Sequence, residues 1–347
     1  MRAPLLPRSS RPSPRDGDDR CRRQSRRARD VRATALLAIV AVLAAVGAAA
    51  CTGDSTPAVR RDSTGAVLPP AESAAAPAAA PAVLGWSDTA AGPALFIPAQ
   101  NPGTAQLVFP GFTDSTLTDT SSFDFGRVHG ARVDLFTRAG AAGSSTLAPN
   151  PVSPSREEEC TSWPTARLTT GAPGAWAVGF AAGHATAIPL DSIEALSRAD
   201  SARLAADAAR LASALPNDTA PAFRGLPFTV HSLRRFSPAP GVEALVADVR
   251  RKVNEEANPR EEHILLVAER DSAQPSSPWT AAYAERVADN EETIESSDVL
   301  AAVALGPRRT PTLVIGREYN EGFAYALLER TGAKQWRLRW SSAYAGC

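Results

Sequence analysis

Apolar residues are distributed unevenly along the chain and separate a front part from a folded region. Residues 33–50 form an uncharged apolar run, and residues 52–83 contain 10 Ala and 5 Pro but no aromatic residue. A segment rich in Ala and Pro and without aromatic residues buries too little apolar surface to fold, so we expect a disordered Ala/Pro tether over 51–83. From residue 84 to 347, short apolar segments alternate with polar turns, which predicts a folded domain.

Two stretches of this domain have the 3.6-residue period of amphipathic helices. The first is 191–215, where Asp191 and Glu194 form a capping box and Pro216 stops the helix. The second is 241–257, followed by Pro259. The apolar faces consist of Ile193, Leu196, Leu204, Ala208, Leu211 and Leu215 in the first helix, and Val242, Leu245, Val246, Val249 and Val253 in the second.

Alternation of apolar and polar residues predicts strands elsewhere, in 84–150, around 176–180 and 226–236, and repeatedly in 261–347. The clearest pair joins Phe323, Tyr325 and Leu327 to Trp336, Leu338 and Trp340 through a turn at Gly332, with Gln335, Arg337 and Arg339 facing water. We therefore predict an α+β fold of antiparallel strands with two main helices, about 191–215 and 241–257, and a C-terminal β-meander. Its sub-blocks are 84–150, 160–260 and 261–347.

The front part has the layout of an export signal, over residues 1–50. Arginines precede the apolar run, and small residues end it. The positive end stays in the cytoplasm while the apolar run enters the bilayer. Translation starts at Met1 or, if a valine codon serves as the start, at Val31.

The sequence "VGAAAC", residues 46–51, resembles the signal of bacterial lipoprotein precursors. This resemblance rests on about 20 residues around the cleavage point. It implies that the thiol of Cys51 receives a diacylglyceryl group and that Cys51 becomes the first, acylated (palmitate-bearing) residue. Ala49 and Ala50 fit the family, whereas Ala48 stands where Leu is usual. Plain secretory cleavage before Cys51 and an uncleaved membrane anchor are the alternatives.

Charge narrows the choice of partners. Residues 1–50 hold 11 Arg and 4 Asp, so the remainder holds 26 basic and 33 acidic residues, a net charge of −7. Nucleic acids and anionic surfaces bind to basic faces, so we expect no nucleic-acid partner.

Two cysteines, Cys160 and Cys347, fall within the exported domain. An even pair outside the cytoplasm predicts a disulfide bond between them. Two free thiols or a nucleophilic Cys160 are the alternatives. The nucleophile is disfavoured because residues 157–159 are three glutamates, which raise a thiol pKa.

The sequence carries no recognisable catalytic or cofactor motif. His129, His184, His231 and His263 form no metal-ligand pair, and the serine-hydrolase and phosphate-loop signatures are missing. The acidic stretch 289–298 lacks the glycine and spacing of a calcium loop. We therefore predict no catalytic residue, no metal and no cofactor.

These observations favour a cell-envelope lipoprotein with a non-enzymatic binding or structural module outside the cytoplasm. It would be held in a membrane by its lipid and would bind an unknown envelope protein or ligand. By the sorting habits of the lipoproteins that this signal resembles, Thr52 after Cys51, rather than Asp, implies the outer membrane. The alternatives are an envelope hydrolase with a spatially assembled Ser/His/acid site, and a sensor of a small molecule or metal. A hydrolase predicts a deep pocket where His and a carboxylate meet Ser or Cys, whereas a binding module predicts shallow grooves with aromatic or edge-strand exposure.

Overall fold

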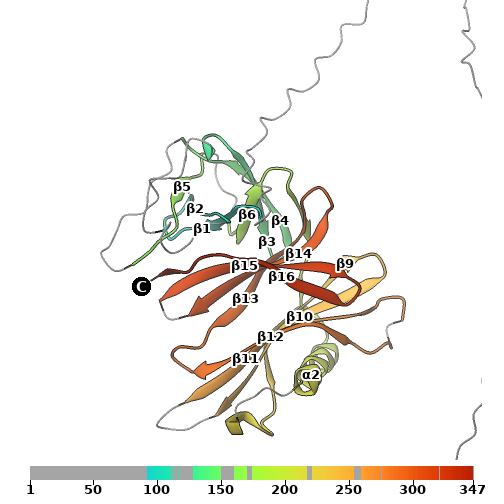
Figure 1. The fold of residues 1–347 in the computed structure, drawn as a ribbon. Helices are drawn as coiled ribbons and strands as arrows, with labels where there is room; N and C mark the ends of the chain where they lie inside the picture. Colours follow the sequence, from blue (N-terminus) through green and yellow to red (C-terminus); the bar gives the residue numbers. More distant parts are fainter. Residues whose placement is uncertain are drawn as a thin grey trace, which may run out of the picture. The chain divides into compact units, whose positions relative to one another are not determined.

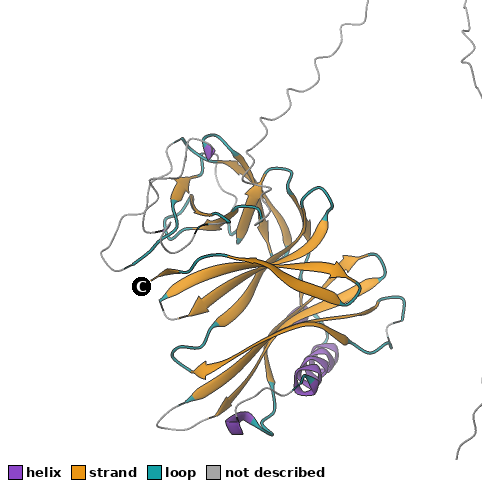
Figure 2. Cartoon of the chain, viewed as in Figure 1, coloured by secondary structure: helices purple, strands orange, loops and turns teal. Residues whose placement is uncertain are grey.

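The computed structural model describes residues 92–110, 112, 117, 128–149, 160–169, 174–216, 221–253, 259–274, 276–319 and 321–346. All of them belong to one compact unit, Ser73–Cys347. This described part is 58% strand, arranged in three antiparallel sheets, with one long helix (Figure 2). The signal segment 1–50, the tether and Cys347 lie outside the described residues.

The first sheet curls until its two edges meet. Its strand order is β4-β3-β6-β1-β2-β5. The edges join where Leu147 bridges Leu168 and where the Ala148 N–H donates to the Arg167 carbonyl at 2.8 Å. The sheet thus closes into a small barrel, which leaves fewer strand edges unpaired. The strands are β1 (Leu95–Pro98), β2 (Thr104–Val108), β3 (Arg132–Thr137), β4 (Gly140–Thr146), β5 (Thr165–Arg167) and β6 (Val178–Ala181).

Alternation along these strands separates the barrel interior from its outer face. Phe96 points inward, while its neighbours Leu95 and Ile97 point outward. Gly179 lies where a Cβ atom would come within 2.8 Å of Val133 Cγ1, so only glycine fits. The interior consists of Ala94, Phe96, Ala105, Leu107, Phe109, Val128, Ala131, Val133, Leu135, Leu147, Ala166 and Leu168.

The other two sheets contain the longer strands (Figure 1). The second sheet has the order β12-β11-β10-β9-β8, with β8 (Asp191–Ser192), β9 (Thr229–Ala239), β10 (Val242–Val253), β11 (Arg260–Asp271) and β12 (Thr280–Asn290). The third has the order β16-β15-β14-β13-β7, with β7 (Ala185–Ile188), β13 (Ser296–Leu305), β14 (Thr310–Tyr319), β15 (Gly322–Gly332) and β16 (Gln335–Ser341). The short β17 (Ala345–Gly346) pairs with β15.

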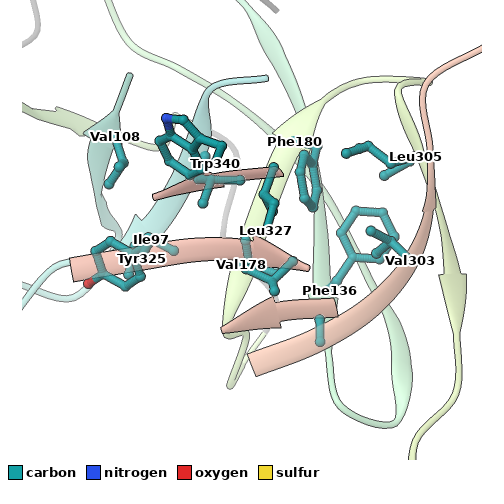
Figure 3. Close-up of a cluster of buried hydrophobic side chains, with 14 of the residues drawn as sticks. Ile97, Val108, Phe136, Val178, Phe180, Val303, Leu305, Tyr325, Leu327 and Trp340 are labelled. Atoms are coloured by element: carbon teal, nitrogen blue, oxygen red, sulfur yellow. The ribbon is translucent and has the colours of Figure 1, made fainter. Parts of the chain in front are cut away.

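Three hydrophobic cores hold the layers together. Helix α2 (Arg198–Ala214) covers one face of the second sheet through Leu204, Ala208 and Leu211. The opposite face of the second sheet packs on the third sheet, where Val246 and Val267 share a core with Leu313 and Leu328. The far face of the third sheet packs on the barrel's outer face, and Figure 3 shows this core between residues such as Phe136, Val178, Val303, Leu327 and Trp340.

The predicted α+β fold with two main helices is therefore wrong, because the chain is mainly β. Within the second predicted helix, 241–257, the residues Val242–Val253 form strand β10. Both faces of β10 are buried: Leu245 and Val249 face α2, whereas Ala244 and Val246 face the third sheet. A strand buried on both faces carries a nearly continuous apolar run, which imitates a helical period.

The first predicted helix, 191–215, is confirmed only in part. It begins later, because Ser197 caps α2 by accepting the Asp200 N–H at 3.1 Å. Asp191 lies in β8 together with Ser192, and the short 3-10 helix η3 (Ile193–Ala195) follows this strand. A second serine, Ser192, caps that turn, so two serine caps replace the expected Asp191 capping box.

The predicted C-terminal hairpin is confirmed as the antiparallel pair β15 and β16, but its facial pattern is wrong. A bulge leaves Arg339 unpaired between Leu338 and Trp340. Trp336 consequently packs toward the second sheet and Trp340 toward the barrel. The left-handed turn position is Lys334, with φ of 56°, rather than Gly332.

Candidate functional site

The structure brings the neighbours of the two predicted disulfide cysteines together. The Thr161 N–H donates to the Gly346 carbonyl at 3.0 Å, so the residue after Cys160 pairs with the residue before Cys347. Cys160 is half-buried. Cys347 and the predicted lipidation site, Cys51, lie outside the described residues.

The histidines do not assemble a hydrolytic site. His129, His184 and His231 lie in turns or on exposed strand positions, whereas His263 is buried on β11. Both ring nitrogens of His263 have partners: Nδ1 lies 3.1 Å from the Glu295 carbonyl, and Nε2 lies 2.7 Å from Glu261 Oε2. A general base needs a ring nitrogen that can reach the substrate, and both nitrogens of His263 are already occupied by partners in the protein. We therefore interpret His263 as a structural side chain.

The Glu261 carboxylate beside this ring is also part of a closed cluster. Lys252 Nζ lies 3.2 Å from its other oxygen. Burial alone would raise the pKa of Glu261, but the hydrogen bonds from His263 and Lys252 outweigh burial and lower it.

Within the described ranges, no three His, Cys, Asp or Glu side chains are grouped to hold a metal ion. Nor does the described part contain a helix with the length and apolarity to cross a membrane.

A groove of about 540 Å³ lies at one end of the third sheet. We call it the basic groove. One wall is the turn between β13 and β14, and the other is the edge strand β16 with Glu329 of β15. It is lined by Leu305, Gly306, Pro307, Arg308, Thr310, Glu329, Arg337, Leu338 and Arg339.

The turn that carries Arg308 is held rigidly. Gly306 has φ of 67°, a conformation that glycine adopts without strain, and its N–H donates to the His184 carbonyl at 2.8 Å. The Arg309 N–H closes the turn on the Gly306 carbonyl at 3.1 Å, and the Arg309 guanidinium is hydrogen-bonded to the Thr186 hydroxyl. Arg308, by contrast, makes no hydrogen bond or ion pair with any described residue, so its guanidinium is available to a ligand.

Positive charge prevails in the basic groove. Three guanidinium groups face one carboxylate, that of Glu329, whose side chain is 13% exposed. Arg339 Nη1 lies 3.4 Å from this carboxylate and Arg337 Nη2 lies 3.8 Å from it. These are loose contacts, and the Arg337 side chain remains 69% exposed.

An apolar residue and an open strand edge accompany these charges. Leu338 is 40% exposed, one of two large apolar side chains that the described surface leaves open. Strand β16 ends the third sheet, so its outer backbone groups have no neighbouring strand in that sheet. Such an edge can accept an added strand.

Sequence reasoning placed Arg337 and Arg339 on the water-facing side of the last strand but assigned them no role. It did not single out Arg308 or Glu329. The available signal was the pair of arginines after Gly306 and Pro307 together with the Arg-Leu-Arg alternation. Only the sheet register shows that the two segments face each other.

No protein-family model, curated protein or solved structure matches the chain. The functional argument therefore rests on the residues themselves.

Proposed function

We propose that this chain is an exported cell-envelope lipoprotein, anchored through Cys51, whose folded domain is a non-enzymatic binding module. The basic groove is its docking surface, and the partner is an extended, acidic segment of another envelope protein. The observation that carries this proposal is a groove in which three arginines face one glutamate beside the edge strand β16. We favour the outer membrane as the site of attachment, because Thr52 follows Cys51.

Charge complementarity selects the partner. Guanidinium groups bind carboxylates through paired hydrogen bonds, and Arg308 and Arg337 are both exposed. An extended segment can also pair its backbone with β16 and place an apolar side chain on Leu338. A polyanion such as nucleic acid is disfavoured, because the exported chain has 33 acidic and 26 basic residues.

Binding of a peptide tests the groove. We would titrate the mature chain with a labelled peptide of alternating Glu and Val, and with a matched peptide of alternating Gln and Val. The groove variant is Arg337→Glu with Arg339→Glu. Its control is Arg203→Glu with Arg210→Glu, which makes the same charge change on the exposed face of α2.

We expect the acidic peptide to bind at least about tenfold more weakly to the groove variant than to wild type, since each charge-assisted contact contributes about 1.5–3 kcal/mol. The control variant and wild type should bind alike, and the Gln peptide should bind poorly to both. Equal losses in the two variants would mean that net charge alone matters. No binding of the acidic peptide to wild type would reject the groove.

The anchor is tested separately, by mass spectrometry of the mature N-terminus. We expect a chain that starts at Cys51 and carries a diacylglyceryl group. A Cys51 terminus without lipid would indicate plain secretion, and a chain that retains residues 1–50 would reject export by cleavage. A Cys51→Ser variant should release the protein from membranes while leaving peptide binding unchanged.

A further inference from the structure

A second cavity, of about 290 Å³, lies beneath the C-terminal end of α2, on the helix-covered face of the second sheet. We call it the helix pocket. It shares no lining residue with the basic groove. It is lined by Ala212, Ser213, Gly225, Leu226, Pro227, Phe228 and Arg251.

Arg251 is the unusual member of this lining. It continues the row of Leu245, Ala247 and Val249 on the face of β10 that packs against α2. The side chain is only 7% exposed, although it carries a charge. Burial of a guanidinium is costly unless other groups compensate for its lost hydration.

Part of that compensation comes from Glu262, which pairs with Arg251 in the β10–β11 register and accepts a hydrogen bond from its Nε. Glu262 is completely buried and also lies 3.3 Å from Nη1 of Arg286, so two cations share its charge. Aromatic rings supply a second contribution. The Arg251 guanidinium carbon lies 4.5 Å from the ring centre of Phe228 and 5.7 Å from that of Phe223.

The donors of Arg251 are not exhausted by these contacts. A guanidinium has five N–H groups. Nε bonds to Glu262, and Nη1 reaches the Leu226 carbonyl at 3.5 Å, the limit of a hydrogen bond. The remaining N–H groups, on Nη1 and Nη2, have no acceptor among the described residues. A buried cation with donors that no described residue uses therefore forms part of the pocket wall.

We propose that the helix pocket binds a small amphipathic carboxylate. The Nη1 and Nη2 groups of Arg251 form a planar fork that fits a carboxylate. Ala212, Leu226, Pro227 and Phe228 form apolar walls for a short hydrocarbon body. The Ser213 hydroxyl already donates to the Ala209 carbonyl at 2.8 Å, so we assign recognition of the carboxylate to Arg251. The volume lies at the small end of ligand sites and limits the ligand to a short chain or single ring.

Hexanoate is a suitable probe, and hexan-1-ol is its neutral counterpart. We would titrate both into the full mature chain by calorimetry and by chemical-shift mapping. Ser213→Trp fills the pocket from an exposed helix position, whereas Ala214→Trp makes the same change at the next exposed position, outside the lining. Arg251→Lys keeps the charge but removes the fork.

We expect saturable hexanoate binding by wild type and by Ala214→Trp, at least tenfold weaker binding by Arg251→Lys, and none by Ser213→Trp. Hexan-1-ol should bind at least tenfold more weakly than hexanoate. Absence of saturable hexanoate binding by wild type would overturn the proposal, as would unchanged binding by Ser213→Trp. Tighter binding of inorganic phosphate than of hexanoate would also overturn it, in favour of a simple oxyanion site. Because the basic groove does not contribute to this pocket, these outcomes are independent of peptide binding there.

Discussion

Glu269 is the residue whose removal should destabilise the domain most clearly, because it joins two sheets at a single buried carboxylate. It lies on β11 and is 2% exposed. Its oxygens accept hydrogen bonds from Arg330 Nε at 2.8 Å and Nη2 at 3.0 Å, from the Lys334 N–H at 2.9 Å, and from Trp336 Nε1 at 2.6 Å. These donors all belong to the β15–β16 hairpin of the third sheet.

The magnitude follows from what Glu269→Ala leaves behind. The Arg330 side chain is 14% exposed and would lose its counter-ion, and the buried Trp336 indole N–H would lose its acceptor. Breaking a buried pair of this kind costs about 3–5 kcal/mol. Glu269→Gln keeps the size and one acceptor oxygen but removes the charge, so we expect about half that loss.

Urea unfolding measures these free energies. The midpoint should fall in the order wild type, Glu269→Gln, Glu269→Ala, with an unchanged slope. Glu292→Ala is the control, because Glu292 is exposed in the turn before β13, and it should change stability by less than about 0.5 kcal/mol. If Glu269→Ala stayed within about 1 kcal/mol of wild type, the carboxylate would not stabilise the fold.

The same residue predicts a pH dependence. Burial alone would raise the pKa of Glu269, but the hydrogen bonds from Arg330, Lys334 and Trp336 outweigh it and lower the pKa. A lowered pKa in the folded state means that the carboxylate stabilises fully above its unfolded pKa of about 4.3. This stabilisation is lost as the pH falls through the folded pKa. Glu269→Gln should therefore flatten the acid limb of the stability curve.

Three further predictions concern other parts of the domain. Gly179→Ala should cost about 1–3 kcal/mol in urea unfolding, because its Cβ would lie 2.8 Å from a barrel side chain, whereas Gly174→Ala, with nothing within 4 Å, should be nearly neutral. Burial raises the pKa of Tyr325 to about 12, so the phenol of the unfolded chain ionises at a lower pH than that of the folded chain. The free energy of unfolding should therefore fall as the pH rises from about 10, by up to about 1.4 kcal/mol per pH unit, and Tyr325→Phe should not show this fall. Reduction of a Cys160–Cys347 disulfide should slow the chain on a gel and lower stability by up to about 5 kcal/mol, and identical mobility with and without reductant would reject the bridge.

The features that could be predicted from the sequence are those with a strictly local cause. The β15–β16 pair follows from alternation around a short turn, and Pro216 marks the end of α2 within two residues. The face of the sheet on which each side chain lies was harder to predict. The bulge at Arg339 places Trp336 and Trp340 on opposite faces, so that they pack in different cores. A bulge has no distinct sequence signal here, and a shift of one residue reverses a face.

The basic groove could not be predicted because it is formed by segments that are distant in the chain. Arg308 lies in a turn, and Arg337 and Arg339 lie on a strand that, among the described strands, pairs with β15 alone. Glu329, between them, continues the buried row of Tyr325 and Leu327, so its charge falls where that core ends. Local patterning can identify exposed arginines, but their convergence depends on sheet order.

The error at β10 also explains why the helix pocket was missed. In a helix over 241–257, Arg250, Arg251 and Lys252 would be consecutive polar residues near a solvated end. In a strand, successive side chains point to opposite faces, so Arg251 turns under α2 while its two neighbours point the other way. The helical assignment therefore predicts that the charge of Arg251 lies in water, whereas in the strand its side chain is 7% exposed and lies beside an apolar cavity. Where both faces of a strand are covered, a charged residue in the apolar row is a better indicator of a site than the apolar residues around it.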